Sequence, residues 1–300
     1  MRVLVTGASG FVGRHLCEHL ESEGDEILPF DPPDLDFIDV RDRNRVITAL
    51  TASGAEVVYH LAALSHVGAS YSNAVDTIRV NVEGTLNVLD ACRQAQVARV
   101  LIVGSGEEYG RGRGIPFDES APLMPVSPYG VSKVAAEYLG LQAYLSGGLE
   151  TVMTRSFNHT GPGQSADFVV PALAHRIAEA ERAGRKEIEV GALESVREFN
   201  DVRDVVRAYR LLVAKGRPGS IYNVCSGVGH TVGEILRRLI RLSGHQVAVR
   251  HDPDLMRKGE PGALVGNASK LESETGWRPR ISLDETLAAI LEEARSSIKP

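Results

Sequence analysis

The 300-residue sequence lacks several signals that would assign it to a special class of protein. Its cysteines are few, odd in number for a disulfide framework and without metal-ligand spacing, so we expect three small buried side chains: Cys17, Cys92 and Cys225. No apolar run approaches the roughly 20 residues that span a membrane. No signal peptide can be read before the first apolar segment. The expectation is a soluble, cytoplasmic protein with no membrane partner.

The chain also lacks a basic stripe, internal repeats and low-complexity tracts. Its net charge of -6 argues against a nucleic-acid partner. The most conspicuous histidine, His159, has no second ligand at metal spacing, so we predict no metal and interpret it as a turn histidine that bonds backbone. With 43% hydrophobic and 24% charged residues, the chain has the composition of an ordinary globular protein.

Strand and helix patterns alternate through the first half of the chain. This alternation predicts an α/β fold, a Rossmann-type doubly wound parallel sheet with its sites at the carboxyl ends of the strands. One long helix is expected over 72–95, and the expected strands are 3–5, 26–30, a short one within 36–42, 57–61, 99–103 and 151–157. After 157 the rhythm loosens, which indicates a smaller C-terminal α/β domain. We expect a dinucleotide-binding domain at 1–157 with a return segment at about 199–225, and a substrate domain at 158–198 and 226–300.

A glycine-rich segment, residues 6–13, stands between the first strand and the first helix. Its glycines, Gly7, Gly10 and Gly13, allow a tight turn and let backbone N–H groups approach a pyrophosphate. Asp31 follows the second strand, 24 residues after Gly7. A carboxylate there accepts hydrogen bonds from a ribose diol and repels a 2′-phosphate, which favours NAD over NADP. A solvated loop aspartate is the alternative, and Arg14 leaves NADP open.

A tyrosine and a lysine four residues apart supply the candidate proton chemistry. Tyr129 and Lys133 share one face of an expected helix. An ammonium beside a phenol favours the phenolate, and the hydroxyl of Ser105 is suited to orient a carbonyl against that phenol. The same spacing occurs on many helices without any function. The pair therefore indicates catalysis only in combination with the cofactor segment before it.

With these motifs the chain resembles the extended short-chain dehydrogenase/reductase family over almost its whole length. The resemblance rests on 6–13, on His60-Leu61-Ala62-Ala63, on Asn81-Val82-Glu83-Gly84-Thr85 and on the Ser105, Tyr129 and Lys133 set. It implies that Tyr129 is the general acid/base, that Lys133 binds the nicotinamide ribose and that Ser105 holds the substrate oxygen. It also implies a homodimer, through the helices after Asn81 and Tyr129, and a cofactor site for NAD(H) or NADP(H): Gly7, Gly10, Phe11, Val12, Gly13, Asp31, Asp39, Val40, Leu61, Ala62, Ala63, Asn81, Tyr129 and Lys133.

The second half resembles family members that bind nucleotide-diphosphate sugars. The loop Asn158–Gln164 is similar to that of members that reduce the C4 ketone of GDP-4-keto-6-deoxy-D-mannose. The resemblance implies that two arginines, Arg197 and Arg257, grip the diphosphate. Glu107 is expected to join the catalytic set, because an acid at this place assists elimination in related 4,6-dehydratases. The expected substrate-binding residues are Ser65, His66, Ser105, Glu107, Asn158, Val170, Arg176, Arg197, Arg257 and Glu260.

Three alternatives to a ketoreductase remain. A nucleotide-sugar 4-epimerase would reduce and reoxidise NAD within one cycle, and a GDP-mannose 4,6-dehydratase would use Glu107. A redox-sensing, NAD-binding regulator on the same fold is disfavoured, because a regulator need keep none of Ser105, Tyr129 and Lys133. Outside the site, we expect Trp277 in the core and Asp201 as a helix cap.

Overall fold

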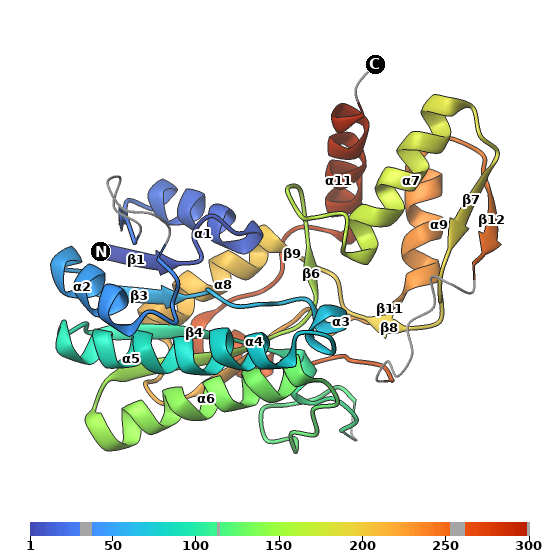
Figure 1. Cartoon of the computed structure of the whole chain (residues 1–300). Coiled ribbons are helices and arrows are strands. Elements are labelled where there is room, and N and C mark those ends of the chain that lie inside the picture. The colour runs from blue at the N-terminus through green and yellow to red at the C-terminus, as the bar shows by residue number, and fades with distance from the viewer. Residues whose placement is uncertain (31–37, 113–114, 253–261, 299–300) are drawn as a thin grey trace.

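The fold is built on a six-stranded, wholly parallel sheet (Figure 1). The computed structural model describes residues 1–30, 38–112, 115–252 and 262–298. The strands lie in the order β10-β5-β4-β3-β1-β2, and their bounds are β1 Arg2–Thr6, β2 Glu26–Leu28, β3 Val57–His60, β4 Arg99–Ser105, β5 Glu150–Ser156 and β10 Ile221–Val224. The predicted doubly wound parallel fold is therefore confirmed.

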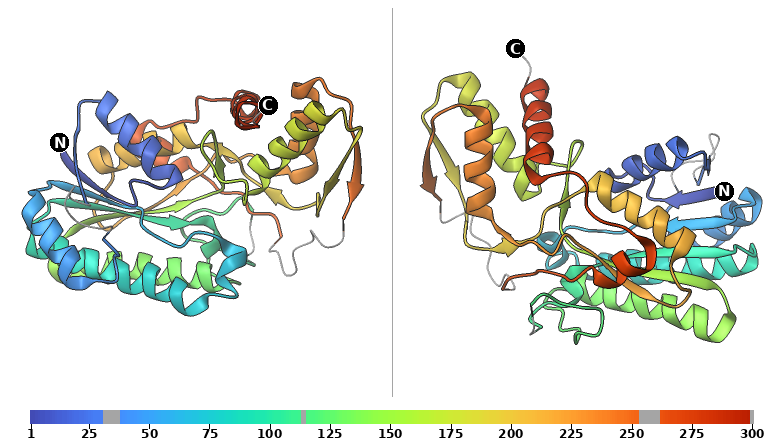
Figure 2. Two further views of the ribbon diagram at one scale, coloured as in Figure 1. Left: turned by 45° about the horizontal axis from the view of Figure 1, so that its top comes forward. Right: turned by 180° about the vertical axis from the view of Figure 1, so that it is seen from behind.

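Helices cover both faces of the sheet (Figure 2). One face carries α1 (Phe11–Ser22) and α8 (Val202–Lys215), and the other carries α2 (Arg43–Ser53), α5 (Gly84–Gln94) and α6 (Pro128–Gly147). Successive residues of β1 join different cores: Val3 and Val5 pack toward α1 and α8, whereas Leu4 packs on the other face. Because both faces are buried, apolar residues stand at successive positions in β1 and β3 rather than at alternate ones.

The strand expected within 36–42 is wrong for the residues that the structure describes there. Ile38 and Asp39 are not in a strand, and Val40 lies in a turn. The carboxylate of Asp39 accepts hydrogen bonds from the backbone N–H of Arg41, at 2.9 Å, and from its guanidinium, at 2.6 Å. Such a local side-chain bond competes with strand pairing. Within the described sheet, β2 is consequently an edge strand.

The single helix expected over 72–95 is three consecutive helical segments. These are α4 (Ala74–Ile78), a π-helical turn (Arg79–Glu83) and α5. Asn81 lies in the π turn, and its side chain bonds both the N–H and the C=O of Leu64. A π turn holds one residue more than an α turn and is frequent at functional sites. Here it aims Asn81 at the segment that follows β3.

A second lobe lies beside the sheet (Figure 1). Its core is formed by α7 (Val169–Ala183), α9 (Val232–Ser243) and α11 (Leu283–Ser297), with β7 (Glu187–Val190) paired to β12 (Ala248–His251). Two small pairings lie between the lobes: β6 (His159–Thr160) with β9 (Asn200–Asp201), and β8 (Val196–Arg197) with β11 (His230–Thr231). The remaining elements are α3 (Val67–Ser70), a 3₁₀ turn (Gly106–Glu108) and α10 (Ser269–Thr275).

Several expectations outside the site are also confirmed. Trp277 is fully buried against α8, and its indole N–H donates to the carbonyl of Asp204 at 2.9 Å. The carboxylate of Asp201 caps α8 by accepting the N–H of Arg203. Cys92 and Cys225 are buried, whereas Cys17 is only partly so. Among the described helices, none is long and apolar enough to cross a membrane.

Candidate active site

The glycine-rich segment forms a narrow turn at the N-terminus of α1. Gly7 has a φ of +75°, a left-handed conformation that disfavours any side chain. A Cβ at Gly13 would lie 2.1 Å from the carbonyl oxygen of Gly7, so only glycine lets the helix approach the turn. Gly10, the N-cap of this 12-residue helix, makes no side-chain cap. The turn therefore presents backbone N–H groups and positive dipole to an anion, which fits the pyrophosphate of a dinucleotide.

A buried histidine, not singled out as a site residue from the sequence, links this segment to the π turn. The two nitrogens of His60, Nδ1 and Nε2, lie 2.8 Å and 2.9 Å from the hydroxyls of Thr6 and Thr85. The Thr85 hydroxyl donates to the carbonyl of Asn81 at 2.6 Å, so Nε2 of His60 carries the proton and donates to Thr85. Burial lowers the pKa of His60 to about 3, so the ring is neutral. A continuous hydrogen-bonded path thus joins β1, β3 and Asn81.

Asn81 fixes the segment after β3 against α6. Its Oδ1 accepts the N–H of Leu64 at 2.8 Å, and its Nδ2 donates to the carbonyl of Leu64 and to Oγ of Ser132, at 3.1 Å and 2.9 Å. Ser132 in turn donates to the carbonyl of Tyr129 at 2.7 Å. The expected cofactor residue Asn81 therefore holds protein groups in place around Tyr129.

Tyr129 and Lys133 lie on the buried face of α6, as their spacing predicts. The helix begins at Pro128, with Ser127 as N-cap, so Tyr129 stands in its first turn. Nζ of Lys133 donates to the carbonyl of Val103 at 2.8 Å and lies 5.9 Å from the centre of the Tyr129 ring. Burial lowers the pKa of Lys133 to about 8. Burial also raises the pKa of Tyr129, and the hydrogen bond to Ser105 only partly opposes this. The phenol consequently keeps its proton at neutral pH, although the sequence spacing had favoured the phenolate.

Ser105 ends β4 opposite the Tyr129 hydroxyl. Its Oγ accepts the N–H of Glu107 at 3.2 Å, which directs the hydroxyl hydrogen away from the turn. A Cβ at Gly106 would lie 3.1 Å from the ring of Phe157, so this position has little room for a larger residue. The charge of Glu107 contributes to the raised pKa of Tyr129. The structure thus brings Ser105, Glu107, Tyr129 and Lys133 together, as predicted.

The structure describes all but one of the residues expected around the adenine end of the cofactor. Asp31 lies outside the described residues. The guanidinium of Arg41 lowers the pKa of Asp39, whose side chain stays partly exposed. Val40 is buried, and its carbonyl accepts a hydrogen bond from Asn87. Leu61, Ala62 and Ala63, which directly follow β3, are each partly buried.

The expected substrate residues are spread over both lobes. The ring of His66 lies 5.7 Å from that of Phe168, which brings the exposed Ser65 and its neighbour to the start of α7. Arg197 is buried and donates to the carbonyls of Val196 and Gly262, each at 2.8 Å. The others are Arg176, partly buried on α7, Val170, buried in the second-lobe core, Asn158, exposed after β5, and Arg257 and Glu260, which lie outside the described residues.

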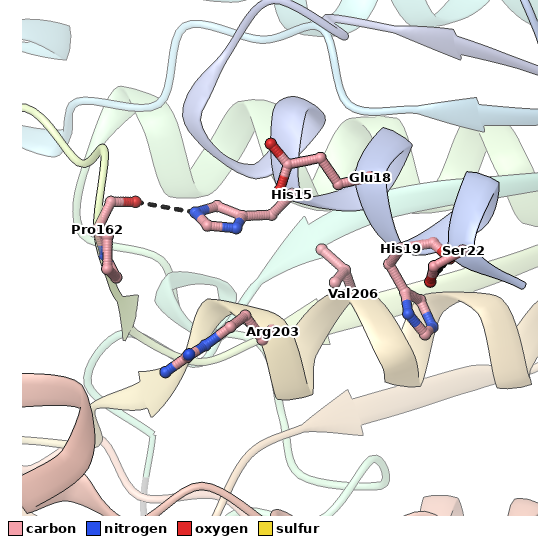
Figure 3. A pocket seen from close by; sticks show the side chains of 7 residues that line it. All are labelled: His15, Glu18, His19, Ser22, Pro162, Arg203 and Val206. Atoms are coloured by element: carbon pink, nitrogen blue, oxygen red, sulfur yellow. Dashed lines mark hydrogen bonds between the residues drawn. The ribbon is translucent and has the colours of Figure 1, made fainter. Parts of the chain in front are cut away.

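The loop Asn158–Gln164 is held by helices of both lobes. Nε2 of His15 donates to the carbonyl of Pro162 at 2.8 Å (Figure 3), and Arg14 donates to the carbonyl of Gly163 at 3.2 Å. The N–H of Gly163 donates to the carboxylate of Glu293 on α11. His159 donates from Nδ1 to the carbonyl of Phe157, which confirms that it bonds backbone, although it lies in the short strand β6 and not in a turn. Because Arg14 is engaged here, it serves the loop that we expect to distinguish the sugar.

A shallow cavity of about 400 Å³ opens beside this loop, on the face of the sheet covered by α1 and α8 (Figure 3). Its lining contains neither Ser105 nor Tyr129 and consists of His15, Glu18, His19, Ser22, Pro162, Arg203 and Val206. It is therefore distinct from the group of candidate catalytic residues. Within the described part of the chain, no cluster of three or more His, Cys, Asp or Glu side chains is arranged to hold a metal.

Known proteins resemble this chain along its whole length. The sequence model of the family described as GDP-mannose 4,6 dehydratase matches residues 31–290. The chain is 34% identical to GDP-6-deoxy-D-mannose reductase of Pseudomonas aeruginosa, covering 99% of this chain and 98% of that one. The solved structure of RMD from Pseudomonas aeruginosa, complexed with NADPH, has a TM-score of 0.91 at 33% identity, with 99% of each chain covered. That of UDP-glucose 4-epimerase from Thermus thermophilus, complexed with NAD, has a TM-score of 0.88 at 31% identity, covering 99% of this chain and 100% of that one.

Proposed function

Because the chain belongs to the GDP-mannose 4,6-dehydratase family of extended short-chain dehydrogenases/reductases, we propose that it is a nicotinamide-dependent nucleotide-sugar 4-ketoreductase. Its substrate is GDP-4-keto-6-deoxy-D-mannose, and its product is GDP-D-rhamnose. The observation that carries this proposal is the buried, protonated phenol of Tyr129 against the hydroxyl of Ser105. The likeness to the Pseudomonas aeruginosa reductase over 99% of the chain supports the choice of sugar.

The residues of the site divide the work of reduction. The reduced nicotinamide, when bound, supplies the hydride. Tyr129 gives its proton to the alkoxide that develops at C4. Ser105 holds that oxygen through its hydroxyl hydrogen, since its Oγ already accepts the Glu107 N–H. Lys133 positions the ribose of the nicotinamide, and the N-terminus of α1 holds the pyrophosphate. Arg197, in β8 between the two lobes, grips the diphosphate of the sugar nucleotide and so orients C4 toward Tyr129.

The protonated state of Tyr129 is the one in which a reductase begins its reaction. A reductase needs an acid at the start of its reaction, whereas a 4-epimerase begins by removing a proton from the C4 hydroxyl. Burial raises the pKa of Tyr129, and the charge of Glu107 raises it further. A phenol in this environment is a poor base at neutral pH. The 4-epimerase and the 4,6-dehydratase, in which Glu107 would assist elimination, are therefore the second choices.

The preference for NADH rests on the sequence position of Asp31. Its carboxylate would repel a 2′-phosphate. Arg14, the cation that left NADPH open, donates to the carbonyls of Ser9 and Gly163 and so is engaged within the protein. The comparison of kcat/KM for NADH and NADPH tests this preference directly. In the variant Asp31→Ser the preference should shift toward NADPH, and an unchanged ratio would remove Asp31 from the cofactor site.

A homodimer is the expected assembly. α4, α5 and α6 lie side by side at the edge of the molecule (Figure 1) and expose large apolar side chains. Val131, Tyr138 and Leu145, spaced seven residues apart along α6, are 47%, 59% and 72% exposed. Val75 on α4 and Leu86 on α5 are exposed as well. Contiguous apolar surface of this kind marks a protein–protein contact, and two identical faces satisfy one another across a twofold axis.

The function is tested with the purified protein, GDP-4-keto-6-deoxy-D-mannose and either NADH or NADPH. We expect one cofactor oxidised per sugar reduced and a product with the configuration of GDP-D-rhamnose by NMR. An epimerase would instead purify with bound NAD and convert a sugar nucleotide without added cofactor. Consumption of neither the keto-sugar nor the reduced cofactor would contradict the proposed reductase.

A further inference from the structure

A buried cluster of three ionisable residues lies directly behind Ser105 and has no part in the chemistry described above. Glu108 belongs to the 3₁₀ turn that follows Ser105, Glu137 lies on α6, and Arg155 lies on β5. All three side chains are at most 4% exposed. Arg155 binds the carboxylate of Glu137 with two nitrogens, Nε and Nη2, each at 2.8 Å. Glu137 alone therefore balances the charge of Arg155, and Glu108 is a second carboxyl group beside one guanidinium.

The contacts of Glu108 show which of its oxygens is satisfied. Its Oε1 accepts the backbone N–H of Ser105 at 2.7 Å. Its Oε2 lies 3.6 Å from Nε of Arg155, but the hydrogen of that nitrogen is directed to Glu137. Nη1 of Arg155 donates to the hydroxyl of Tyr109 and to a backbone carbonyl. Among the described residues, Oε2 of Glu108 thus has no hydrogen-bond donor.

The carboxyl groups of Glu108 and Glu137 converge on Nε of Arg155, which lies 3.6 Å from Oε2 of Glu108 and 2.8 Å from Oε2 of Glu137. Two ionised carboxylates buried side by side repel one another, and neither has a hydrogen to donate to the other. A proton on Oε2 of Glu108 satisfies both groups. Burial, and then the charge of Glu137, raise the pKa of Glu108 well above its ordinary value. The cations on the neighbouring elements are Arg155, committed to Glu137, and Lys133, which bonds the carbonyl of Val103.

We propose that Glu108 is a positioning residue for Ser105, a neutral carboxylic acid that donates to Glu137 and holds the Ser105 N–H with its other oxygen. Tyr129, Lys133 and Glu137 follow one another at intervals of four along α6. The Glu108–Glu137 bridge therefore joins the turn that carries Ser105 to the helix that carries Tyr129, and it sets the distance between their hydroxyls. This consequence for catalysis rests on the role proposed for Ser105.

The backbone beside the cluster is shaped to admit Glu108. A Cβ at Gly104 would lie 2.5 Å from Oε1 of Glu108 and 2.2 Å from the carbonyl oxygen of Thr154. Any larger residue at Gly104 would displace either the carboxyl group or the strand. Gly104 and Glu108 thus form a matched pair, in which the missing side chain of one makes room for the buried side chain of the other.

Two variants of Glu108 separate a positioning role from a charge effect. Glu108→Gln keeps an oxygen for the Ser105 N–H and supplies an N–H for Glu137, so kcat should stay within about twofold of the wild type. Glu108→Met has similar size but neither group, and kcat should fall by about 10- to 100-fold, since a small misplacement of a catalytic group has this effect. KM should stay within about threefold in both, because Glu108 does not touch the substrate.

A matched control removes another buried hydrogen bond that α6 accepts. Thr151 on β5 donates to the carbonyl of Gly140 on α6 at 2.9 Å, at the end of the strand away from Ser105. Thr151→Val should lower the melting temperature and leave kcat unchanged. A loss of kcat in Thr151→Val equal to that in Glu108→Met would show that general loosening explains the effect, and it would overturn the positioning role.

Infrared spectroscopy tests the protonation of Glu108 without any substrate. The wild-type protein at neutral pH should show the carbonyl stretch of a buried carboxylic acid, and this band should be missing from Glu108→Gln. Absence of the band in the wild type, or a Glu108→Gln variant as slow as Glu108→Met, would overturn the neutral acid. Failure of the wild type to reduce the keto-sugar would contradict the proposed function instead, and the infrared result would be unaffected by it.

Discussion

The two faces of α6 reverse the usual distribution of polar and apolar side chains. Its buried face carries Tyr129, Lys133 and Glu137, whereas its outer face exposes Val131 and Leu145 among other apolar residues. In an ordinary surface helix the apolar stripe faces the core. We infer from this arrangement that the helix serves two purposes beyond stability. Under the proposed function, its inner face transfers a proton and its outer face contacts a second subunit.

The largest effect should come from the inner face. Tyr129→Phe removes the hydroxyl that we expect to give its proton to the alkoxide oxygen at C4, and kcat should fall by about 1,000-fold or more. Binding of NADH, followed by fluorescence titration, should change by less than about threefold, because the ring and its packing remain. A variant that reduces the keto-sugar at a near-native rate would remove Tyr129 from the chemistry.

Changes on the outer face of α6 should weaken the proposed dimer. The double variant Tyr138→Lys, Leu145→Lys places charge in the apolar surface of α6, and the dimer should dissociate about 100-fold more readily. Sedimentation velocity over a range of protein concentrations measures this. The control is Ala183→Lys, an exposed position at the end of α7 in the second lobe rather than on α6. A wild-type protein that sediments as a monomer at every concentration would show that a second subunit does not account for the exposed apolar residues of α6.

The smallest expected effect is the pH dependence of kcat/KM that Lys133 causes. Burial lowers the pKa of Lys133 to about 8, so its ammonium is present below that pH and is lost as the pH rises through it. Since we propose that the charged form holds the nicotinamide ribose, kcat/KM should fall by about tenfold for each pH unit above 8. In Lys133→Arg the decline should move to higher pH, because an arginine stays charged. A flat profile to about pH 10 in the wild type would contradict this role.

The sequence predicts the sheet because its strands are buried on both faces and alternate with helices, a pattern that local composition reveals. It also identifies Tyr129 and Lys133, since four-residue spacing on a helix is a local property. Other features depend on segments that are distant in the sequence. The path from Thr6 through His60 to Thr85 exists only because β1 and β3 are neighbours. Residue spacing alone does not reveal such contacts.

Glu108 was missed for a different reason. It stands next to Glu107, and two adjacent acids in a turn ordinarily suggest a solvated surface. Only the pairing of β4 with β5 places Arg155 beside it, and only the packing of α6 adds Glu137. The third member of the series Tyr129, Lys133 and Glu137 was a usable signal, because its position on the catalytic face of the helix predicts burial.

The π turn at Arg79–Glu83 also fixes the phase between the two halves of its helix. One residue more or less in a helix rotates everything on one side of it by about 100° relative to the other. A single-codon deletion here would therefore rotate α4 relative to α5, while releasing Asn81 from Leu64. The proposed subunit contact and the proposed active site thus both depend on the number of residues in this segment, so insertions and deletions there should be tolerated far less than substitutions.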